Sequence, residues 1–579
     1  MSAPTLQSFI AGQWLGEKAA QSLRSAVNGE VIYHTHEEQI DFAQSLDFAR
    51  SKGQQSLLDM DFQTRASCLR ALGKYLMEHK ESLYKISALT GATRADSWVD
   101  IEGGAGTLFA YASLGRRELP SGNLIHEGDA MPLGREGQFC GSHILVPRRG
   151  VAVHINAFNF PVWGMLEKFA PNFLAGMPCI VKPASSTSYL TEAAVRLMHE
   201  SGLLPEGSLQ LVIGRTGDLL DRLQGQDMVT FTGSASTAAM LRTNDNLIKN
   251  SVPFNAEADS LNCAILAPDV TPDDVEFDLF VKEVAREMTV KAGQKCTAIR
   301  RVLVPENRLD AVADKLSARL AKMTVGDPEL EGVRMGALAS HDQQKDVRHQ
   351  LEALMASSDV VCGNSRDFSA RGEGTDKGAF FEPTVLVNNT PDADGGAHDI
   401  EAFGPVSTLM PYRDTEHALA LAARGKGSLV STLVTRDPAI AADMVPVMAS
   451  WHGRVHILDE RAAKESTGHG SPLPLLKHGG PGRAGGGEEL GGLRAVKHYM
   501  QRTAIQGSPG SLMAVTSEYI TKESDSLACL KNVSILCTGD STMRSLCDNI
   551  IILKTNECIQ TKTERNKTKC SDRLIEHWD

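Results

Sequence analysis

The stretch Gly150-Val-Ala-Val-His-Ile155 opens the part of the sequence that decides the fold. From there on, short apolar runs alternate with segments in which apolar residues recur three and four positions apart. The predicted strands are 151–155, 178–181, 209–213 and 228–231, and the predicted helices between them are 163–175 and 189–199. Repeated β-α units of this length predict an α/β fold with a parallel sheet, helices on both faces and ligands at the carboxyl ends of the strands.

The segment before these units, residues 38–88, is predicted to be helical because its apolar residues keep the spacing of a helix with charges between them. Residues 90–104 carry helix and turn signals without an obvious site. The turns after the predicted strands lack the Gly-x-Gly-x-x-Gly fingerprint, so the phosphate loop of a standard dinucleotide-binding fold is not expected.

Length and composition exclude several functional classes. A chain of 579 residues suggests about three to four domains, and 42% apolar with 22% charged residues is typical of a globular protein. The formal net charge of −12 argues against nucleic acid or an anionic membrane as a partner. The sequence has no secretory signal and no apolar run of membrane-spanning length, and its 11 cysteines form no Cys-x-x-Cys pair. We therefore expect a cytoplasmic protein with free thiols and no metal site.

Cys296 is the residue with the strongest case for chemistry. It lies in Lys291-Ala-Gly-Gln-Lys-Cys-Thr-Ala-Ile-Arg-Arg301, three positions after a glycine that would allow a close approach of backbone and ligand. Thiolate is the reactive form. A free thiol has a pKa of about 8.5, so it needs a cation, a helix N-terminus or a base beside it to lose its proton. Lys295, Arg300 and Arg301 are candidate cations by sequence proximity. The alternative is a small, buried apolar cysteine.

The run Ala292–Arg301 resembles the nucleophile motif of the aldehyde dehydrogenase superfamily, in which Gly-Gln-x-Cys is followed five residues later by Arg. Further motifs of that family follow in its order along the chain. The resemblance implies two parallel-sheet α/β domains, one for the cofactor and one for catalysis, and a small β arm for oligomerisation. The domains expected are 1–124 with 150–256 for NAD(P), 257–460 for catalysis, 125–149 with 461–507 for the arm and a glycine-rich segment, and 508–579 as an atypical tail.

Two further catalytic residues are implied by the resemblance. Asn159 matches the family's Asn-Phe-Pro, where the side-chain amide and the Cys296 backbone N–H hold an oxyanion, although asparagine is also a common turn residue. Glu257, in Glu-Ala-Asp-Ser where the family has Glu-Leu-Gly-Gly, is implied as the general base. Asp259 competes, because residues two apart on a strand face the same side. An apolar surrounding is expected to raise the pKa of such a base.

The turn Phe231-Thr-Gly-Ser234 resembles the family segment that meets the cofactor pyrophosphate at a helix N-terminus. Gly233 would permit close approach and Ser234 would cap the helix, which is also what an ordinary N-cap does. Lys182, in Lys-Pro-Ala-Ser185, matches the lysine that reaches the adenosine ribose. Relatives that prefer NAD commonly carry Glu where this chain has Ser185, so we expect NADP as the cofactor, with NAD as the alternative.

Glu401 and Phe403 match the family's Glu-x-Phe-Gly-Pro-Val, in which the glutamate grips the nicotinamide ribose and the phenylalanine backs the ring. The region 464–504 is glycine-rich, which on composition alone predicts a flexible linker. Its sequence, however, resembles one subgroup of the family, the dehydrogenase half of the bifunctional proteins of bacterial phenylacetate degradation. This likeness runs from about residue 6 to residue 509.

The tail differs in composition from the rest of the chain. Residues 511–579 contain no Pro or Phe and five of the 11 cysteines. Relatives in the subgroup continue into a hydratase domain with an Asp-x-x-x-x-His pair, and Asp572 and His577 have that spacing. Because only two residues follow, we interpret the pair as coincidence and expect no intact hydratase domain; a frameshifted or foreign C-terminus is the hypothesis.

The predicted function is NADP-dependent oxidation of a CoA-linked semialdehyde, of the 3-oxo-5,6-dehydrosuberyl-CoA semialdehyde type, to a free acid. Related alternatives are the semialdehyde of benzoyl-CoA epoxide breakdown, a cofactor-independent cysteine esterase or thioesterase, and a non-catalytic assembly subunit. The resemblance also implies a homo-oligomer built from dimers, in which the arm near 125–149 and the strand near 493–505 pair between subunits. A separate enoyl-CoA hydratase is a possible partner.

Overall fold

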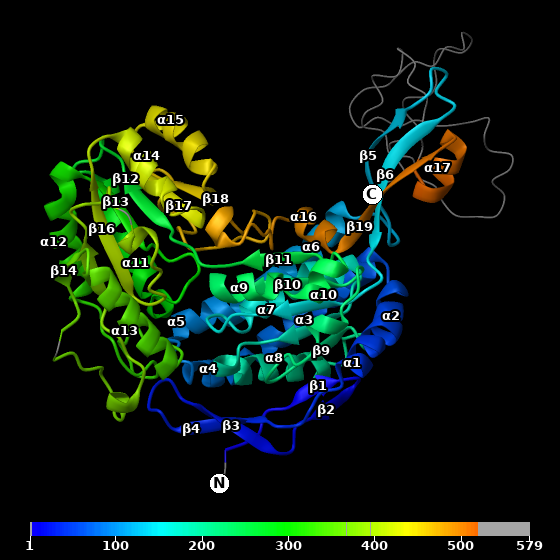
Figure 1. The fold of residues 1–579 in the computed structure, drawn as a ribbon, viewed down its shortest axis with the longest axis horizontal. Coiled ribbons are helices and arrows are strands. Elements are labelled where there is room, and N and C mark those ends of the chain that lie inside the picture. Colours follow the sequence, from blue (N-terminus) through cyan, green and yellow to red (C-terminus); the bar gives the residue numbers. More distant parts are fainter. Residues whose placement is uncertain (1–2, 366, 394, 519–579) are drawn as a thin grey trace, which may run out of the picture. The chain divides into compact units, whose positions relative to one another are not determined.

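Two seven-stranded sheets carry most of the described chain, which comprises residues 3–365, 367–393 and 395–518 of this computed structural model (Figure 1). Both sheets belong to one compact unit formed by residues 1–125 and 145–503. A second unit combines residues 126–144 with the chain from residue 504 on. The α/β class and the two parallel-sheet layers expected from the sequence are confirmed.

The first sheet has the order β11-β10-β7-β8-β9-β1-β2. Its strands are β1 Ser8–Ile10, β2 Gln13–Leu15, β7 Ala152–Ile155, β8 Cys179–Lys182, β9 Leu209–Leu211, β10 Met228–Thr232 and β11 Phe254–Glu257. The five strands from β7 to β11 are parallel to their neighbours, and the β1-β2 hairpin joins the β9 edge in antiparallel orientation. All four strands predicted between residues 151 and 231 are therefore present, with ends that differ by one or two residues.

Successive strand residues point to opposite sides of this sheet, so each face carries apolar side chains that helices bury. Ala152 packs with one core and its neighbours Val151 and Val153 pack with the other. The first core contains α3 Phe62–Glu78, α6 Gly103–Glu118, α7 Trp163–Ala175 and α8 Ser188–Glu200. The second core contains α1 Phe42–Phe48, α9 Ala235–Arg242 and α10 Asp245–Lys249.

The predicted helical segment 38–88 is interrupted rather than continuous. A π-helical turn at Ala49–Gly53 links α1 to α2 Gln54–Leu58, and Asp61 caps α3 by accepting the Thr64 backbone N–H. After α4 Lys80–Ala88 come α5 Arg94–Ser97 and a second π-helical turn, Trp98–Glu102, that runs into α6. A hairpin of β3 Ala19–Arg24 and β4 Val31–His36 precedes these helices.

The second sheet has the order β14-β15-β16-β13-β12-β17-β18 and is parallel except for the β14-β15 pair. Its strands are β12 Cys263–Leu266, β13 Arg301–Pro305, β14 Asp359–Cys362, β15 Thr384–Val387, β16 Val406–Tyr412, β17 Ser428–Val434 and β18 His452–Leu458. Helices α11 Val275–Thr289 and α12 Leu309–Leu320 share a core with Val302 and Val304. Helices α13 His341–Met355, α14 Thr415–Ala423 and α15 Pro438–Ala449 pack on the face of Leu303.

Residues of the second unit form most of a three-stranded sheet of order β19-β6-β5 and all of helix α17 Pro509–Thr516. Its strands are β5 Ile125–Pro132, β6 Cys140–Pro147 and β19 Met500–Gly507. Strands β19 and β6 are neighbours within the sheet of this chain, and the expected pairing of these regions between subunits stays a prediction. Residues 519–579, including the Asp572 and His577 pair, lie outside the described residues.

The glycine-rich segment is a packed part of the larger unit, so the flexible-linker interpretation is wrong. The backbone N–H of Gly487 donates to the Ala256 carbonyl on β11, and the Ala258 N–H donates to the Ala484 carbonyl. A Cβ on Gly487 would lie 2.3 Å from that Ala256 oxygen. Glycine is required here because two backbones lie against each other. The segment ends in α16 Leu493–His498. Within the described residues, no helix has the length and apolarity needed to cross a membrane.

Candidate active site

The loop that carries Cys296 begins with a run of left-handed backbone. After α11, Lys291, Ala292 and Gly293 have φ values of 55°, 53° and 70°. Such conformations cost roughly 1–2 kcal/mol for each non-glycine residue and persist only where neighbours fix them. Asp96 does so by accepting the Lys291 backbone N–H at 2.7 Å. The stretch 90–104, which showed no site in the sequence, therefore shapes the turn before the nucleophile.

Gly293 permits a close approach, but to protein rather than to ligand. A Cβ at this position would lie 2.2 Å from the carbonyl oxygen of Gly404. On the other side of the loop, the Asn262 side-chain amide donates to the carbonyls of Cys296 at 2.8 Å and Ala298 at 2.9 Å. The thiol is thus carried by a loop that is fixed on both sides.

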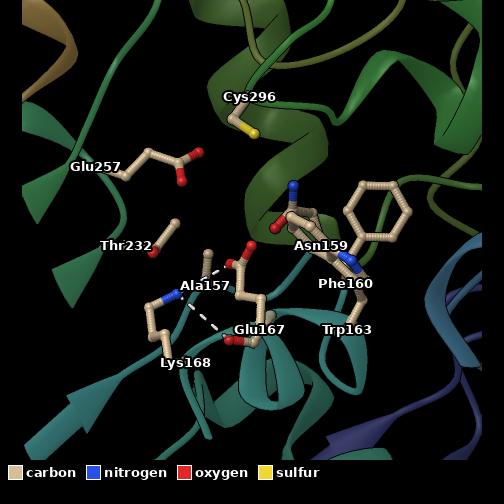
Figure 2. A pocket seen from close by; sticks show the side chains of 10 residues that line it. Ala157, Asn159, Phe160, Trp163, Glu167, Lys168, Thr232, Glu257 and Cys296 are labelled. Atoms are coloured by element: carbon tan, nitrogen blue, oxygen red, sulfur yellow. Dashed lines mark hydrogen bonds and ion pairs between the residues drawn. The ribbon is translucent and has the colours of Figure 1, made fainter. Parts of the chain in front are cut away.

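Cys296, Glu257 and Asn159 line the same small cavity of about 20 Å³, large enough for about one water molecule (Figure 2). The cavity is lined by Ala157, Asn159, Phe160, Trp163, Gly164, Glu167, Lys168, Thr232, Glu257 and Cys296. Thr232 ends β10, so the cavity reaches the first residue after Phe231 in the predicted cofactor turn. Residues predicted from three separate motifs are therefore brought together.

The three cations predicted to activate the thiol are each engaged with another group, although the charge of Lys295 still acts to lower the pKa of Cys296. Lys295 forms a buried ion pair with Glu287 at 2.6 Å. Arg300 donates to the carbonyls of Gly404 and Gly293, and Arg301 donates to the Leu261, Leu421 and Ala422 carbonyls. Sequence proximity was misleading because these side chains hold backbone carbonyls around the loop.

Burial and the neighbouring Glu257 carboxylate raise the pKa of the Cys296 thiol well above its usual range. A side-chain nitrogen of His478, a carboxylate oxygen of Glu257 and the sulfur all lie within 4.8 Å of one another. Without ligand the thiol is therefore protonated, and the adjacent carboxylate is placed to remove its proton.

Glu257, at the end of β11, is 1% exposed. Burial favours its neutral form, but the adjacent His478 and then Lys168 outweigh burial and lower its pKa to about 2. The expected rise in the pKa of this carboxyl is therefore wrong. His478 Nε2 lies 3.0 Å from Glu257 Oε2. Its orientation is outside hydrogen-bond geometry, so the contact is an ion pair when His478 is protonated.

Asp259 is not a competing base. The strand ends at Glu257, and the Asp259 carboxylate accepts the Ala235 backbone N–H at 2.8 Å, at the start of α9. It also lies 3.6 Å from Arg483. The rule that residues two apart share a face fails because residue 259 lies beyond the strand.

A buried charge cluster on the floor of the cavity was not found in the sequence. Lys168 on α7 lies 3.1 Å from a carboxylate oxygen of Glu167 (Figure 2). It also lies 3.1 Å from a carboxylate oxygen of Glu489. All three side chains are buried. The available signal was a Glu-Lys pair inside the otherwise apolar helix 163–175. His478 gave no comparable signal, because it lies among glycines.

Asn159 directs its side-chain amide toward the nucleophile loop. Its Nδ2 donates to the carbonyl of Gln294 at 3.0 Å, and its side chain is 7% exposed at the cavity wall. An amide nitrogen carries two hydrogens, so one remains available to an oxyanion beside Cys296.

The second predicted cofactor motif presents a buried carboxylate. Glu401 accepts the Ser260 backbone N–H through Oε2 at 3.1 Å, while Oε1 makes no hydrogen bond to the part of the chain that the structure describes. Burial raises the pKa of Glu401 to about 7, against the attraction of Arg300 at 3.8 Å. Phe403 lies beneath the Arg300 guanidinium, 5.4 Å from its centre. A carboxylate oxygen that accepts no hydrogen bond fits a ribose hydroxyl.

The remaining predicted cofactor residues lie near the carboxyl ends of β8 and β10. Lys182 ends β8 and donates to the Pro183 carbonyl, and Ser185 starts a short 3₁₀ turn. Ser234 caps α9 by accepting the Thr237 N–H at 3.2 Å. Phe231 belongs to the core, and a Cβ on Gly233 would lie 2.6 Å from its ring. Because Gly233 has no side chain, only its backbone atoms lie at the end of β10.

Comparisons with known proteins agree with this arrangement. The model of the aldehyde dehydrogenase family matches residues 14–505, and the chain belongs to that family. It is an enzyme of the aldehyde dehydrogenase type. The fold is similar to betaine aldehyde dehydrogenase from Staphylococcus aureus in complex with NAD+, with a TM-score of 0.76 and 22% identity, covering 87% of this chain and 95% of that one.

Two curated relatives have a higher identity. The chain is 43% identical over 480 residues to 3,4-dehydroadipyl-CoA semialdehyde dehydrogenase of Aromatoleum evansii, covering 82% of this chain and 93% of that protein. It is 54% identical over 187 residues to Protein MaoC of Klebsiella aerogenes, covering 32% of this chain and 54% of that protein.

Proposed function

We propose that the protein oxidises a CoA-linked, open-chain semialdehyde to the free carboxylic acid with NADP. The observation that carries the chemistry is the cavity where a thiol, a carboxylate and an amide from three separate segments converge. The CoA-linked substrate rests on the 43% identical relative, whose name specifies a semialdehyde of that kind.

In this mechanism Glu257 takes the proton of Cys296, and the thiolate adds to the aldehyde carbon while Asn159 and the Cys296 backbone N–H hold the oxyanion. Bound NADP would accept the hydride from that carbon, which leaves a thioester on Cys296. Glu257 releases its first proton to solvent and then takes a proton from water, while the water oxygen adds to the thioester carbon. The carbon–sulfur bond breaks to release the acid, and the Cys296 thiolate takes the proton back from Glu257. The cavity has room for that water.

The cofactor is proposed to lie along the first sheet, with Gly233 and Ser234 at the pyrophosphate, Lys182 at the adenosine ribose and Glu401 with Phe403 at the nicotinamide end. The Glu401 oxygen that accepts no hydrogen bond from the described residues supports this placement. A serine at 185 leaves room for a 2′-phosphate, where a glutamate would repel it. The first sheet is then the cofactor domain and the second sheet the catalytic domain. A cytoplasmic homo-oligomer built from dimers is part of the same proposal.

Two substrates of this class are compared, 3-oxo-5,6-dehydrosuberyl-CoA semialdehyde and 3,4-dehydroadipyl-CoA semialdehyde. The subgroup resemblance of segment 464–504 supports the first, and the relative that the chain matches over 93% of its length supports the second. Both join an aldehyde to a CoA thioester through an open chain.

The test measures kcat/KM for each semialdehyde, and for a free aldehyde of equal chain length, with NADP and with NAD. We expect both CoA-linked substrates to exceed the free aldehyde by at least tenfold with NADP, and Ser185→Glu to reverse the cofactor preference. Equal values for free and CoA-linked aldehydes would refute the substrate class. A tenfold preference of the wild type for NAD would refute the cofactor assignment.

A further inference from the structure

His478 touches the proposed base and has no role in the chemistry described so far. Its imidazole is 3% exposed, its Nε2 lies 3.0 Å from Glu257 Oε2, and its ring makes an edge contact with Trp163 at 5.9 Å. Its backbone carbonyl accepts the Glu489 N–H at 2.9 Å. The ring is therefore held between the cavity wall and the base.

The charged groups around Glu257 act in opposite directions. Glu167 on α7, Glu489 in the segment beside His478 and the Cys296 sulfur, once it is a thiolate, disfavour a second negative charge in this buried space. Lys168 favours that charge, but it already lies within 3.1 Å of both Glu167 and Glu489. His478 lies at contact distance from Glu257, where it supplies positive charge when it is protonated, and a rotation of its ring would let its N–H donate to the carboxylate.

We infer that His478 is a positioning residue for hydrolysis: it holds the Glu257 carboxylate ionised and aimed at the thioester on Cys296. This inference rests on the proposed function, since it requires Glu257 to be the base that activates water. The imidazole itself touches neither substrate nor reacting atoms. Its effect is confined to the protonation and orientation of the carboxylate that it contacts.

The sign of the effect follows from these contacts. Without the imidazole, burial and the surrounding carboxylates act on Glu257 against Lys168, and in the acyl-enzyme the sulfur no longer has a hydrogen to donate, so the pKa of Glu257 rises. A protonated Glu257 cannot take a proton from water, and release of the acid slows most at low pH. Formation of the thiolate also slows, because Glu257 takes the Cys296 proton too. Addition to the aldehyde and loss of hydride do not need the base, so the acyl-enzyme should still form, more slowly, and accumulate.

The experiment compares wild type, His478→Phe, His478→Gln and Glu257→Gln, with NADP and the aldehyde that the wild type oxidises fastest. NADPH formed per active site in the first turnover, acyl-enzyme mass by intact mass spectrometry, and kcat between pH 5.5 and 9 are measured. We expect His478→Phe to form one NADPH per site and to accumulate acyl-enzyme. Its kcat at pH 7 should fall at least tenfold, with the acid limb moved up by a pH unit or more. His478→Gln, which keeps an N–H donor, should recover most of the turnover.

These outcomes distinguish an error in the proposed role of Glu257 from an error in the role of His478. If Glu257→Gln hydrolyses its acyl-enzyme at the wild-type rate, the proposed role of Glu257 is wrong. If Glu257→Gln accumulates acyl-enzyme but His478→Phe keeps the wild-type pH profile, the positioning role alone is wrong. A His478→Phe protein that loses the first turnover and melts well below wild type, with no recovery in His478→Gln, would identify His478 as merely structural.

Discussion

At the residue scale, the contribution of Asn159 is set by geometry rather than charge. Its amide lies at the cavity wall with one hydrogen committed to the Gln294 carbonyl. Asn159→Ala removes the proposed oxyanion donor, and loss of such a donor slows the step by about 100- to 1,000-fold. The rate of the first NADPH turnover is the measurement. An unchanged melting temperature would assign the loss to catalysis, whereas an unchanged rate would rule out this donor.

We predict that cofactor binding depends on pH through the Glu401 carboxyl. Its folded pKa of about 7 means that the carboxyl is protonated at pH 6 and ionised at pH 8. The ionised form accepts the ribose hydroxyl better, so the Kd of NADP+ should fall as pH rises through 7, by up to about tenfold. Titration calorimetry measures this. Glu401→Gln is the matched control, because it shares the titration of the cofactor phosphate; equal slopes in both proteins would contradict the prediction.

Short sequence motifs were enough to single out individual residues of the cavity. The cavity brings together Cys296, Glu257 and Asn159, which separate motifs had singled out. The pKa direction of Glu257 could not be predicted, because it depends on His478, 221 positions later in the sequence. The role of Arg300 was missed for the same reason, since its carbonyl partner at residue 404 is brought close only by the fold.

At the element scale, the glycine-rich segment positions β11 and therefore Glu257. Gly487→Ala would place a Cβ 2.3 Å from the Ala256 carbonyl oxygen and 2.5 Å from Asn255 Oδ1. We expect a loss of about 1–3 kcal/mol in the free energy of unfolding, and roughly a tenfold or greater loss of kcat because the base shifts. Thermal melts and kcat measure both effects.

Gly106→Ala is the control for that substitution. Gly106 lies in α6 with no atom within 4 Å of an added Cβ. Alanine favours a helix over glycine by about 1 kcal/mol, so this variant should melt slightly above wild type with unchanged kcat. A Gly487→Ala protein that behaved like Gly106→Ala would show that the segment does not constrain β11.

Element types were predictable where periodicity is strong, as in α7, whose observed bounds equal the predicted 163–175. The packed structure of the glycine-rich segment was not predictable. Its glycine content indicates how flexible the isolated chain is, but it does not show which backbone packs against the segment. Likewise, the left-handed turn at Lys291 is imposed by Asp96, whose bond to the turn spans 195 positions. Non-glycine residues give no local signal for such a conformation.

At the scale of the whole molecule, every residue proposed for catalysis or cofactor binding lies between 159 and 403, and the supporting His478 and Glu489 lie before β19. We therefore predict that deleting residues 519–579 leaves kcat and KM for the semialdehyde within twofold of the full chain. Steady-state kinetics of the two proteins measures this. A loss of tenfold or more would show that the tail serves the dehydrogenase.

A longer deletion, from residue 508 on, is expected to behave differently. It also removes α17, whose Leu512 is 3% exposed and packs with Cys140 of β6 in a separate small core. Exposing this apolar contact should lower the melting temperature or cause aggregation, because a small core has little other burial to rely on. Comparing the two deletions by thermal melting and light scattering therefore separates α17, which stabilises the second unit, from the residues after 518. If both deletions behave like the full chain, the contact of α17 with β6 contributes nothing to stability.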